Sequence, residues 1–160
     1  MTESFDYMTS LNYLGEMQSE TGDIKGSILT LTQVVELQRK VLKGAEKLES
    51  VFTLKVLAEE LIKNGQRAEG LSYAELALKI QMDTYMGIVN SEVQETMLLV
   101  AEILTLTPSK VDAALGFYIE VLDARASVEP VIDIYRRMAP LYTQKGNYRE
   151  AVDCLRKILV

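Results

Sequence analysis

The feature that most constrains this chain is a fixed interval between small residues and turn residues that occurs four times. In each copy a small residue precedes a turn by seven positions, and a second small residue follows the turn by five. The first small residues are Gly15, Ala58, Ala101 and Ala139, the turns are Gly22, Gly65, Pro108 and Gly146, and the second small residues are Ser27, Gly70, Ala113 and Ala151. Such a repeated interval is typical of a helical repeat array.

Apolar periodicity and turn signals around these intervals predict eight helices. The expected ranges are about 4–20, 24–43, 46–64, 66–85, 91–107, 109–126, 130–145 and 148–160. Gly44 is expected to end the second helix, and Asp23 to cap its start. Ser91 with Gln94 resembles a capping box for the fifth helix.

Further signals concern the last three helices. Ser109 is expected to start the sixth helix and Pro130 to occupy the first position of the seventh, in which Pro140 should cause a kink. In the sixth helix, a register counted from Ala114 buries Tyr118 and Val121, whereas one counted from Ala113 buries Glu120. The first register is preferred because burying an unpaired carboxylate is costly.

Apolar residues at helical spacing predict which helix faces point inward. The first helix is expected to bury Leu11, Leu14 and Met17, with Gly15 allowing a neighbour to approach closely, and the last is expected to bury Ala151, Leu155 and Ile158.

Composition excludes several classes of function. The chain has 160 residues, 48% of them apolar, and a net charge of −6, which argues against a nucleic-acid partner. It has no apolar run long enough to insert into a membrane and no histidine, so Ser-His and Cys-His catalysis and histidine metal sites are ruled out. The one cysteine, Cys154, is expected to be a buried thiol and fits a cytoplasmic or nuclear location.

The small residues are preceded by large ones, in the pairs Leu14-Gly15, Leu57-Ala58, Val100-Ala101 and Met138-Ala139. Together with Tyr142 and the unit from Gly146 to Leu159, these pairs resemble the tetratricopeptide repeat (TPR). The small residues lie 43, 43 and 38 positions apart, more than the roughly 34 of the typical unit, so the chain looks like the long-unit, kinesin light chain variety. A HEAT-like array is the structural alternative.

The resemblance implies an all-α, right-handed α-solenoid of about eight antiparallel helices in four TPR-like units. These units span about 4–44, 46–87, 91–126 and 130–160, within a single domain covering 1–160. Because the last helix ends in Ile158-Leu159-Val160 without a polar capping helix, we expect the chain to belong to a longer protein or to self-associate through its C-terminal end.

In the TPR family the first helices of successive units line a groove that holds a partner's peptide or helix. Positions counted from each small residue place nine residues in this partner-binding groove: Asn12, Glu16, Phe52, Lys55, Glu59, Glu95, Leu98, Glu102 and Arg136. Glu16, Glu59 and Glu102 each follow a small residue directly, and a column of three carboxylates would favour a basic peptide. Alternatively, these glutamates form an ordinary solvated helix face.

The residue types in and beside the groove indicate which kinds of partner should bind and which should not. Lys55 resembles one member of the family's clamp for a chaperone's C-terminal carboxylate, but Glu59 and Glu102 stand where asparagine is expected, so no chaperone tail should bind. Phe52, Leu98 and Leu106 either form pockets for apolar anchors or pack on neighbouring helices.

The sequence offers no catalytic motif, and we expect a non-enzymatic protein without cofactor or metal. Glu59 and Glu60 are adjacent on a helix and cannot face one substrate. Three functions stay open: a scaffold module that binds a protein segment in its groove, an architectural or oligomerisation segment of a large assembly that acts through its ends and convex face, and a domain that senses a small peptide ligand.

Overall fold

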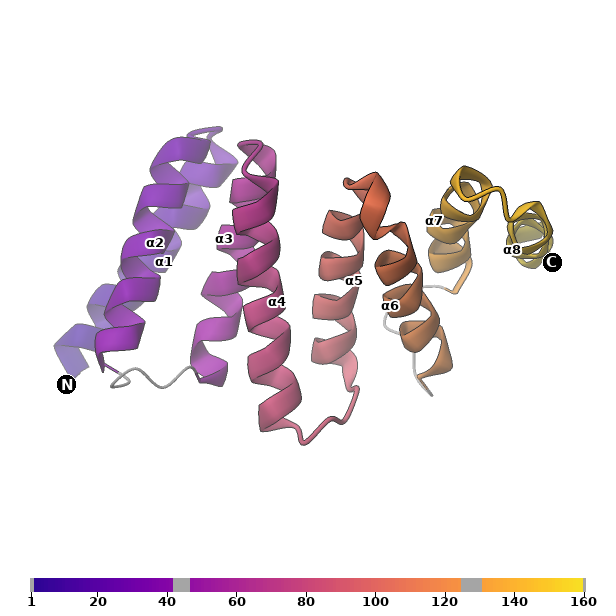
Figure 1. Ribbon diagram of the computed structural model, residues 1–160. Coiled ribbons are helices and arrows are strands. Elements are labelled where there is room, and N and C mark those ends of the chain that lie inside the picture. The colour runs from indigo at the N-terminus through magenta and orange to yellow at the C-terminus, as the bar shows by residue number, and fades with distance from the viewer. Residues whose placement is uncertain (1, 42–46, 125–130, 160) are drawn as a thin grey trace. The chain divides into compact units, whose positions relative to one another are not determined.

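The computed structural model describes residues 2–41, 47–124 and 131–159, and in these ranges it contains helices and no strand (Figure 1). The α-helices are α1 (Thr2–Glu20), α2 (Ile24–Val41), α3 (Val51–Lys63), α4 (Arg67–Thr84), α5 (Ser91–Thr105), α6 (Val111–Asp123), α7 (Val131–Gln144) and α8 (Tyr148–Leu159). Short 3₁₀ turns, η1 (Leu48–Ser50) and η2 (Pro108–Lys110), precede α3 and α6.

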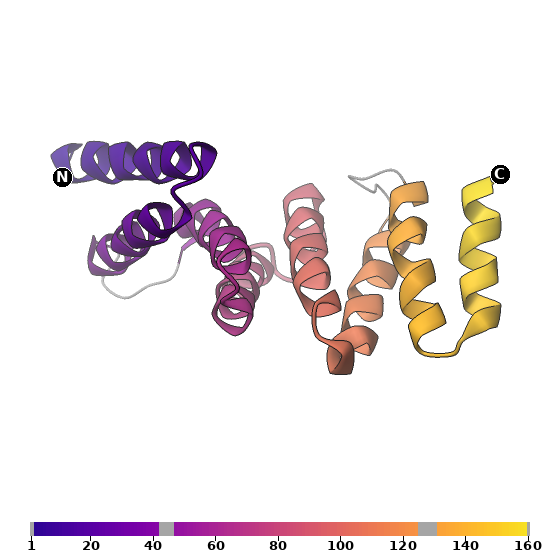
Figure 2. The ribbon, with the colours of Figure 1, turned by 90° about the horizontal axis from the view of Figure 1, so that it is seen from above.

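The helices form two compact units, Met1–Gly87 and Ile88–Val160, called unit 1 and unit 2 below. In unit 1, α1 packs on α2, α2 on α3, and α3 on α4. In unit 2, α5 packs on α6, α6 on α7, and α7 on α8. Each unit therefore consists of two helix hairpins, and Figure 2 shows α7 and α8 side by side with the tight turn between them.

Three of the predicted turns use a glycine in the left-handed conformation. The φ angles are +85° at Gly22, +83° at Gly65 and +77° at Gly146. Each glycine N–H donates to the carbonyl three residues earlier at 3.0 Å, and the next N–H reaches the carbonyl five residues earlier at 2.8, 2.8 and 2.9 Å. This is the Schellman arrangement, which needs a residue that tolerates positive φ. At the fourth turn, Pro108 instead begins η2.

Small residues lie where the helices of a hairpin approach each other. A Cβ atom added to Gly15 would come within 2.8 Å of the Leu31 side chain, and one added to Gly70 within 2.9 Å of the Ala58 carbonyl oxygen. The Ser27 hydroxyl donates a 2.8 Å hydrogen bond to the Gly15 carbonyl. The predicted close approach at Gly15 is therefore confirmed.

The two cores contain most of the apolar residues that helical periodicity predicted to face inward. The core of unit 1 includes Leu31, Val35, Leu54, Leu57, Leu61, Ala77 and Ile80. In unit 2 the preferred register of the sixth helix is correct, because Ala114, Tyr118 and Val121 are buried while Ala113 and Glu120 are exposed.

Two predicted helix caps are wrong, although α5 begins at Ser91 as expected. The N-cap of α5 is Asn90, whose side-chain oxygen accepts the Val93 N–H at 3.0 Å, and Gln94 is buried rather than part of a capping box with Ser91. The residue at the N-cap of α6 is Lys110 and not Ser109, because the chain first makes the 3₁₀ turn at Pro108. At α2 the prediction is correct, since Asp23 Oδ1 accepts the Gly26 N–H at 3.0 Å.

Three residues predicted to be buried are exposed. Leu14 and Met17 lie on the outer face of α1, and Leu155 on the outer face of α8, each about half exposed. The inner face of α8 instead presents Ala151 and Cys154. Pro140 lies inside α7. The roles predicted for Gly44 and Pro130, and the end of the sixth helix beyond Ala124, lie outside the described residues.

Candidate functional site

In unit 1 the predicted groove residues of α3 share one face. Phe52, Lys55 and Glu59 are spaced by three and four residues, which places their side chains along one side of a helix. Phe52 is 56% exposed, Glu59 is exposed and Lys55 is half-buried. This face combines an accessible aromatic ring with charges of both signs.

The neighbouring residue of α1, Asn12, is held by contacts inside the unit. Its Oδ1 accepts a 3.0 Å hydrogen bond from the Thr53 hydroxyl, whose oxygen accepts in turn from Gln38 Nε2 at 3.3 Å. This chain of side chains joins α1, α3 and α2. Glu16, one turn further along α1, is half-buried.

A second polar cluster in unit 1 was not predicted. The Glu60 side chain is 1% exposed, and its Oε1 accepts from the Ser19 hydroxyl at 2.7 Å and from Lys63 Nζ at 2.6 Å. A signal was available in the repeat interval, because the equivalent positions two residues after Gly15, Ala101 and Ala139 hold the apolar residues Met17, Ile103 and Leu141, of which Ile103 and Leu141 are buried. Glu60 thus occupies a core position.

In unit 2 the predicted groove residues differ in exposure and in partners. Glu95 and Glu102 are exposed, but Leu98 is only 4% exposed, so for Leu98 the alternative of packing inside the fold holds. A Glu102 carboxylate oxygen lies 2.7 Å from Arg137 Nη1, an ion pair between α5 and α7. Arg136 pairs with Asp133 on its own helix.

The three glutamates of the predicted column are divided between the two units. Glu16 and Glu59 lie in unit 1, while Glu102 lies in unit 2. Their alignment in one column therefore stays a prediction.

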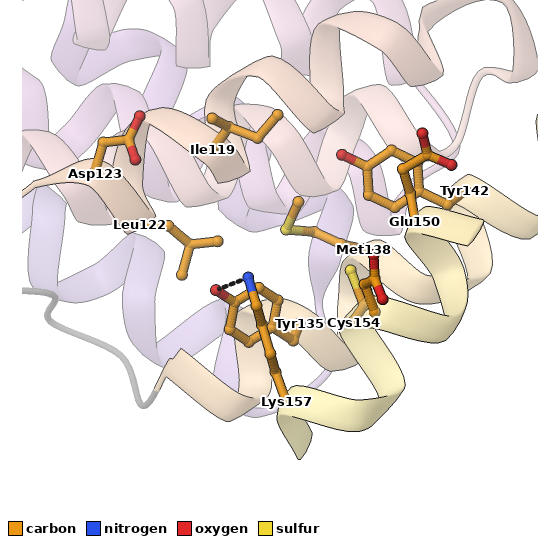
Figure 3. A pocket seen from close by; sticks show the side chains of 10 residues that line it. Ile119, Leu122, Asp123, Tyr135, Met138, Tyr142, Glu150, Cys154 and Lys157 are labelled. Atoms are coloured by element: carbon orange, nitrogen blue, oxygen red, sulfur yellow. Dashed lines mark hydrogen bonds between the residues drawn. The ribbon is translucent and has the colours of Figure 1, made fainter. Parts of the chain in front are cut away.

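A pocket of about 330 Å³ lies in unit 2 between α6, α7 and α8 (Figure 3). Met138 and Cys154 line it with buried side chains, and Tyr135 and Tyr142 contribute half-buried rings. The other lining residues are Ile119, Leu122, Asp123, Glu150, Asp153 and Lys157. The pocket thus combines an apolar floor with aromatic walls and charged groups.

Burial and neighbouring groups shift the pKa values of Cys154, Tyr142 and Lys157 in this pocket. Burial raises the pKa of the Cys154 thiol, which keeps it protonated at neutral pH. Burial also raises the pKa of Tyr142, and the nearby Cys154 and Glu150 add to that rise. The pKa of Lys157 is raised as well, first because its ammonium donates a 3.0 Å hydrogen bond to the Tyr135 hydroxyl.

Neither Glu150 nor Lys157 was predicted from the sequence as a site residue. A signal existed, because Tyr135, Met138 and Tyr142 are spaced by three and four residues, as are Glu150, Cys154 and Lys157. In a helix hairpin two such stripes face one another, although periodicity alone does not show that they leave a space between them.

The described residues contain no group of three or more His, Cys, Asp or Glu arranged to hold a metal ion. Within 2–41, 47–124 and 131–159, no helix is both long and apolar enough to cross a bilayer.

No family model and no curated protein matches this sequence. Several solved structures share its fold. A crystal structure of kinesin light chain TPR-like repeats from Podosopora anserina superposes with a TM-score of 0.76 at 19% identity, covering 94% of this chain and 72% of that one. A structure of MamA gives 0.73 at 16% identity, with 95% and 76% covered.

A third similar structure is BtubC (BKLC) from P. vanneervenii, with a TM-score of 0.73 at 11% identity and with 94% and 61% of the two chains covered. The all-α repeat fold predicted from the small-residue interval is confirmed by these structures. The chain therefore has the fold of tetratricopeptide-like helical repeats of the kinesin light chain type.

Proposed function

We propose that this protein is a protein–protein interaction scaffold without catalytic activity, and that the first helix of each hairpin contacts a segment of a partner with basic character. The observation that carries this proposal is the exposed face of α3, where Phe52 stands beside Lys55 and Glu59. An accessible aromatic side chain flanked by charges is typical of an interface anchor. Repeat proteins with this fold use such extended helix surfaces for binding.

Charge supports a basic partner. Glu16, Glu59, Glu95 and Glu102 place four carboxylates on the first helices of three hairpins, and the whole chain has a net charge of −6. A partner segment rich in Lys or Arg would be attracted to this surface, and an acidic segment would be repelled.

The proposal is tested with a triple variant carrying Glu16→Lys, Glu59→Lys and Glu102→Lys, probed on an array of basic, neutral and acidic peptides. The expected result is loss of binding to the basic peptides. The matched control carries Glu36→Lys, Glu75→Lys and Glu120→Lys, three exposed glutamates on α2, α4 and α6 that change the net charge equally. Equal loss of binding in both triple variants, or none in the first, would overturn the assignment to the first helices.

A second candidate function, an architectural role through self-association, is favoured by the outer face of α8. Val152, Leu155 and Leu159 are 44, 50 and 85% exposed there. A second copy is a suitable occupant, because α1 also exposes apolar side chains and carries Asp6, Glu16 and Glu20, whereas α8 carries three cations, Arg149, Arg156 and Lys157, against the two acids Glu150 and Asp153. Light scattering across a concentration series tests this role, and a chain that stays monomeric at millimolar concentration would refute it.

A further inference from the structure

The pocket between α6, α7 and α8 lies on the face of α7 opposite to the predicted groove residues of that helix. At 3.6 residues per turn, Tyr135, Met138 and Tyr142 share one side of the helix, and Arg136 and Pro140 point to the other side. Figure 3 shows the two tyrosines and Met138 among the side chains that surround the pocket, with Tyr135 hydrogen-bonded to Lys157 of α8. The pocket is therefore separate from the surface that carries the proposed scaffold function.

The inner part of the pocket is suited to an aliphatic stem. Met138 and Cys154 are 3 and 5% exposed, and Leu122 lies beside them. Because burial raises its pKa, the Cys154 thiol is neutral at physiological pH. This floor therefore carries no charge and offers dispersion contacts to a linear side chain.

The rim of the pocket is suited to a cation. Three carboxylates, those of Asp123, Glu150 and Asp153, line the pocket together with the ammonium of Lys157. The pKa of Tyr142 is raised first by burial and then by the neighbouring Cys154 and Glu150, so the Glu150 carboxylate lies close to this tyrosine. Asp153 also pairs with Arg156 of its own helix at 3.5 Å. An apolar ligand would cover the Asp123 and Glu150 carboxylates without pairing them, which is costly.

The Tyr135 ring of the pocket already contacts a cation of the protein itself, Lys157. The Lys157 ammonium lies 4.6 Å from the centre of the Tyr135 ring, within the range of a cation–π interaction, and 3.0 Å from the Tyr135 hydroxyl. Tyr142 presents a second ring across the pocket, beside Glu150 (Figure 3). An incoming cation could make with the Tyr142 ring the same kind of contact that Lys157 makes with the Tyr135 ring.

We propose that this pocket binds an arginine side chain of a partner protein. A guanidinium can stack on the Tyr142 ring while its N–H groups donate to the Glu150 carboxylate, and its methylene stem can contact Met138 and Leu122. The volume of about 330 Å³ is sufficient for one such side chain. Arginine suits the pocket better than lysine because its planar group can stack and form a forked hydrogen bond at once.

The proposal is tested on the full chain by NMR titration of backbone amides with N-acetyl-arginine amide. The neutral isostere N-acetyl-citrulline amide and N-acetyl-lysine amide serve as comparison probes. We expect saturable shifts confined to the lining segments of α6, α7 and α8, with a dissociation constant in the millimolar range, and at least about tenfold weaker binding of citrulline because it lacks the charge. Equal binding of citrulline and arginine, or of lysine and arginine, would overturn the proposal.

Two variants locate the interaction within the pocket. Glu150→Gln should weaken binding of the arginine probe about tenfold, and Glu120→Gln, an exposed glutamate of α6 that does not line the pocket, should leave it unchanged. If the two variants weaken binding equally, the probe responds to general charge and the pocket assignment fails. The spectrum of each variant reports directly whether it is folded.

The titration is independent of the proposed groove. A double variant carrying Glu16→Lys and Glu59→Lys should bind the arginine probe with unchanged affinity, because both residues lie in unit 1 and neither lines the pocket. Loss of probe binding in that variant would place the interaction on the first helices instead. The groove proposal can therefore fail while the pocket proposal stands, and the reverse is also possible.

Discussion

Gly70 lies where α4 crosses α3, and its missing side chain allows the two helices to approach closely. A Cβ atom there would meet the Ala58 carbonyl oxygen at 2.9 Å and the Ile62 side chain at the same distance. The carbonyl belongs to the backbone, so the helices themselves would have to separate. The second small residue of the repeated interval is thus a packing requirement in this hairpin.

We predict that Gly70→Ala lowers the free energy of unfolding of unit 1 by about 1–3 kcal/mol, because of overpacking. Gly116→Ala, in the exposed middle of α6, has no atom within 4 Å of the new Cβ and should raise stability by about 0.5–1 kcal/mol. Urea unfolding followed by circular dichroism measures both changes. Similar effects of the two substitutions would show that helix propensity, and not the crossing, determines the outcome at position 70.

The ionisation of Cys154 links stability to pH. Burial raises its pKa above the ordinary value of 9.0, so in the alkaline range the unfolded chain loses the thiol proton before the folded chain does. The stabilising contribution is therefore present below pH 9.0 and is lost as the pH rises through the folded pKa.

We predict that Cys154→Ala makes the decline of the unfolding free energy above pH 9 shallower, even though the smaller side chain lowers stability at pH 7. Thermal or urea unfolding at several values between about pH 7 and 10.5 measures the slope. Tyr142, whose pKa is also raised, contributes in the same direction, so Tyr142→Phe is the companion variant. Parallel curves for wild type and Cys154→Ala would contradict the prediction.

At the scale of single residues, the sequence predicted the small positions well and the buried charge poorly. Gly15 and Ala58 were assigned from spacing, and steric contact makes such positions intolerant of larger side chains. The burial of Glu60 was not predicted, because a charged residue is normally exposed. Its two partners are Lys63, one turn along the same helix, and Ser19, which is 41 positions away and belongs to another hairpin. A local pattern contains no information about that contact.

The start of α5 shows why helices are easier to predict than their caps. Asn90 and Ser91 are adjacent and both are good N-cap residues. The choice between them depends on which residue adopts the extended backbone, and Asn90 does so with φ −88° and ψ −177°. Apolar periodicity determines that a helix forms here, but it does not resolve a shift of one residue at its end.

We predict that Asn90→Ala destabilises unit 2 by about 0.5–2 kcal/mol, because the Val93 N–H loses its acceptor. Ser91→Ala should change stability by less than about 0.5 kcal/mol, as expected for an exposed residue outside the cap. Thermal unfolding of the two variants under identical conditions measures the difference. A larger loss of stability for Ser91→Ala than for Asn90→Ala would show that Ser91, and not Asn90, caps α5.

On the scale of the whole chain, the fold depends on spacing more than on residue identity. The similar solved structures share between 11 and 19% of their aligned residues with this chain. Turn glycines and small residues at fixed intervals were sufficient to predict helix hairpins of this kind. The pocket could not be predicted, because it depends on how three helices from a stretch of nearly 40 residues diverge.

The net charge of −6 leads to a prediction for binding. Affinity for a basic peptide should fall about tenfold between about 0.05 and 0.5 M salt, because salt screens the attraction between exposed charges. Fluorescence anisotropy with a labelled Lys- and Arg-rich peptide measures this dependence, and a scrambled acidic peptide is the control. Affinity that does not change with salt would mean that apolar contacts such as that of Phe52 dominate.

The buried Glu60 has a consequence for the order of the hairpins. One carboxylate oxygen, Oε1, accepts from Ser19 of the preceding hairpin and from Lys63 of its own helix, while the corresponding positions in α5 and α7 hold Ile103 and Leu141. If the α3–α4 hairpin were duplicated or moved behind another one, the Glu60 carboxylate would keep Lys63 but lose the Ser19 hydroxyl, and a lost hydrogen bond to a charged group costs about 1.5–3 kcal/mol. Hairpins with the same fold are therefore not interchangeable modules, and this one is adapted to a single predecessor.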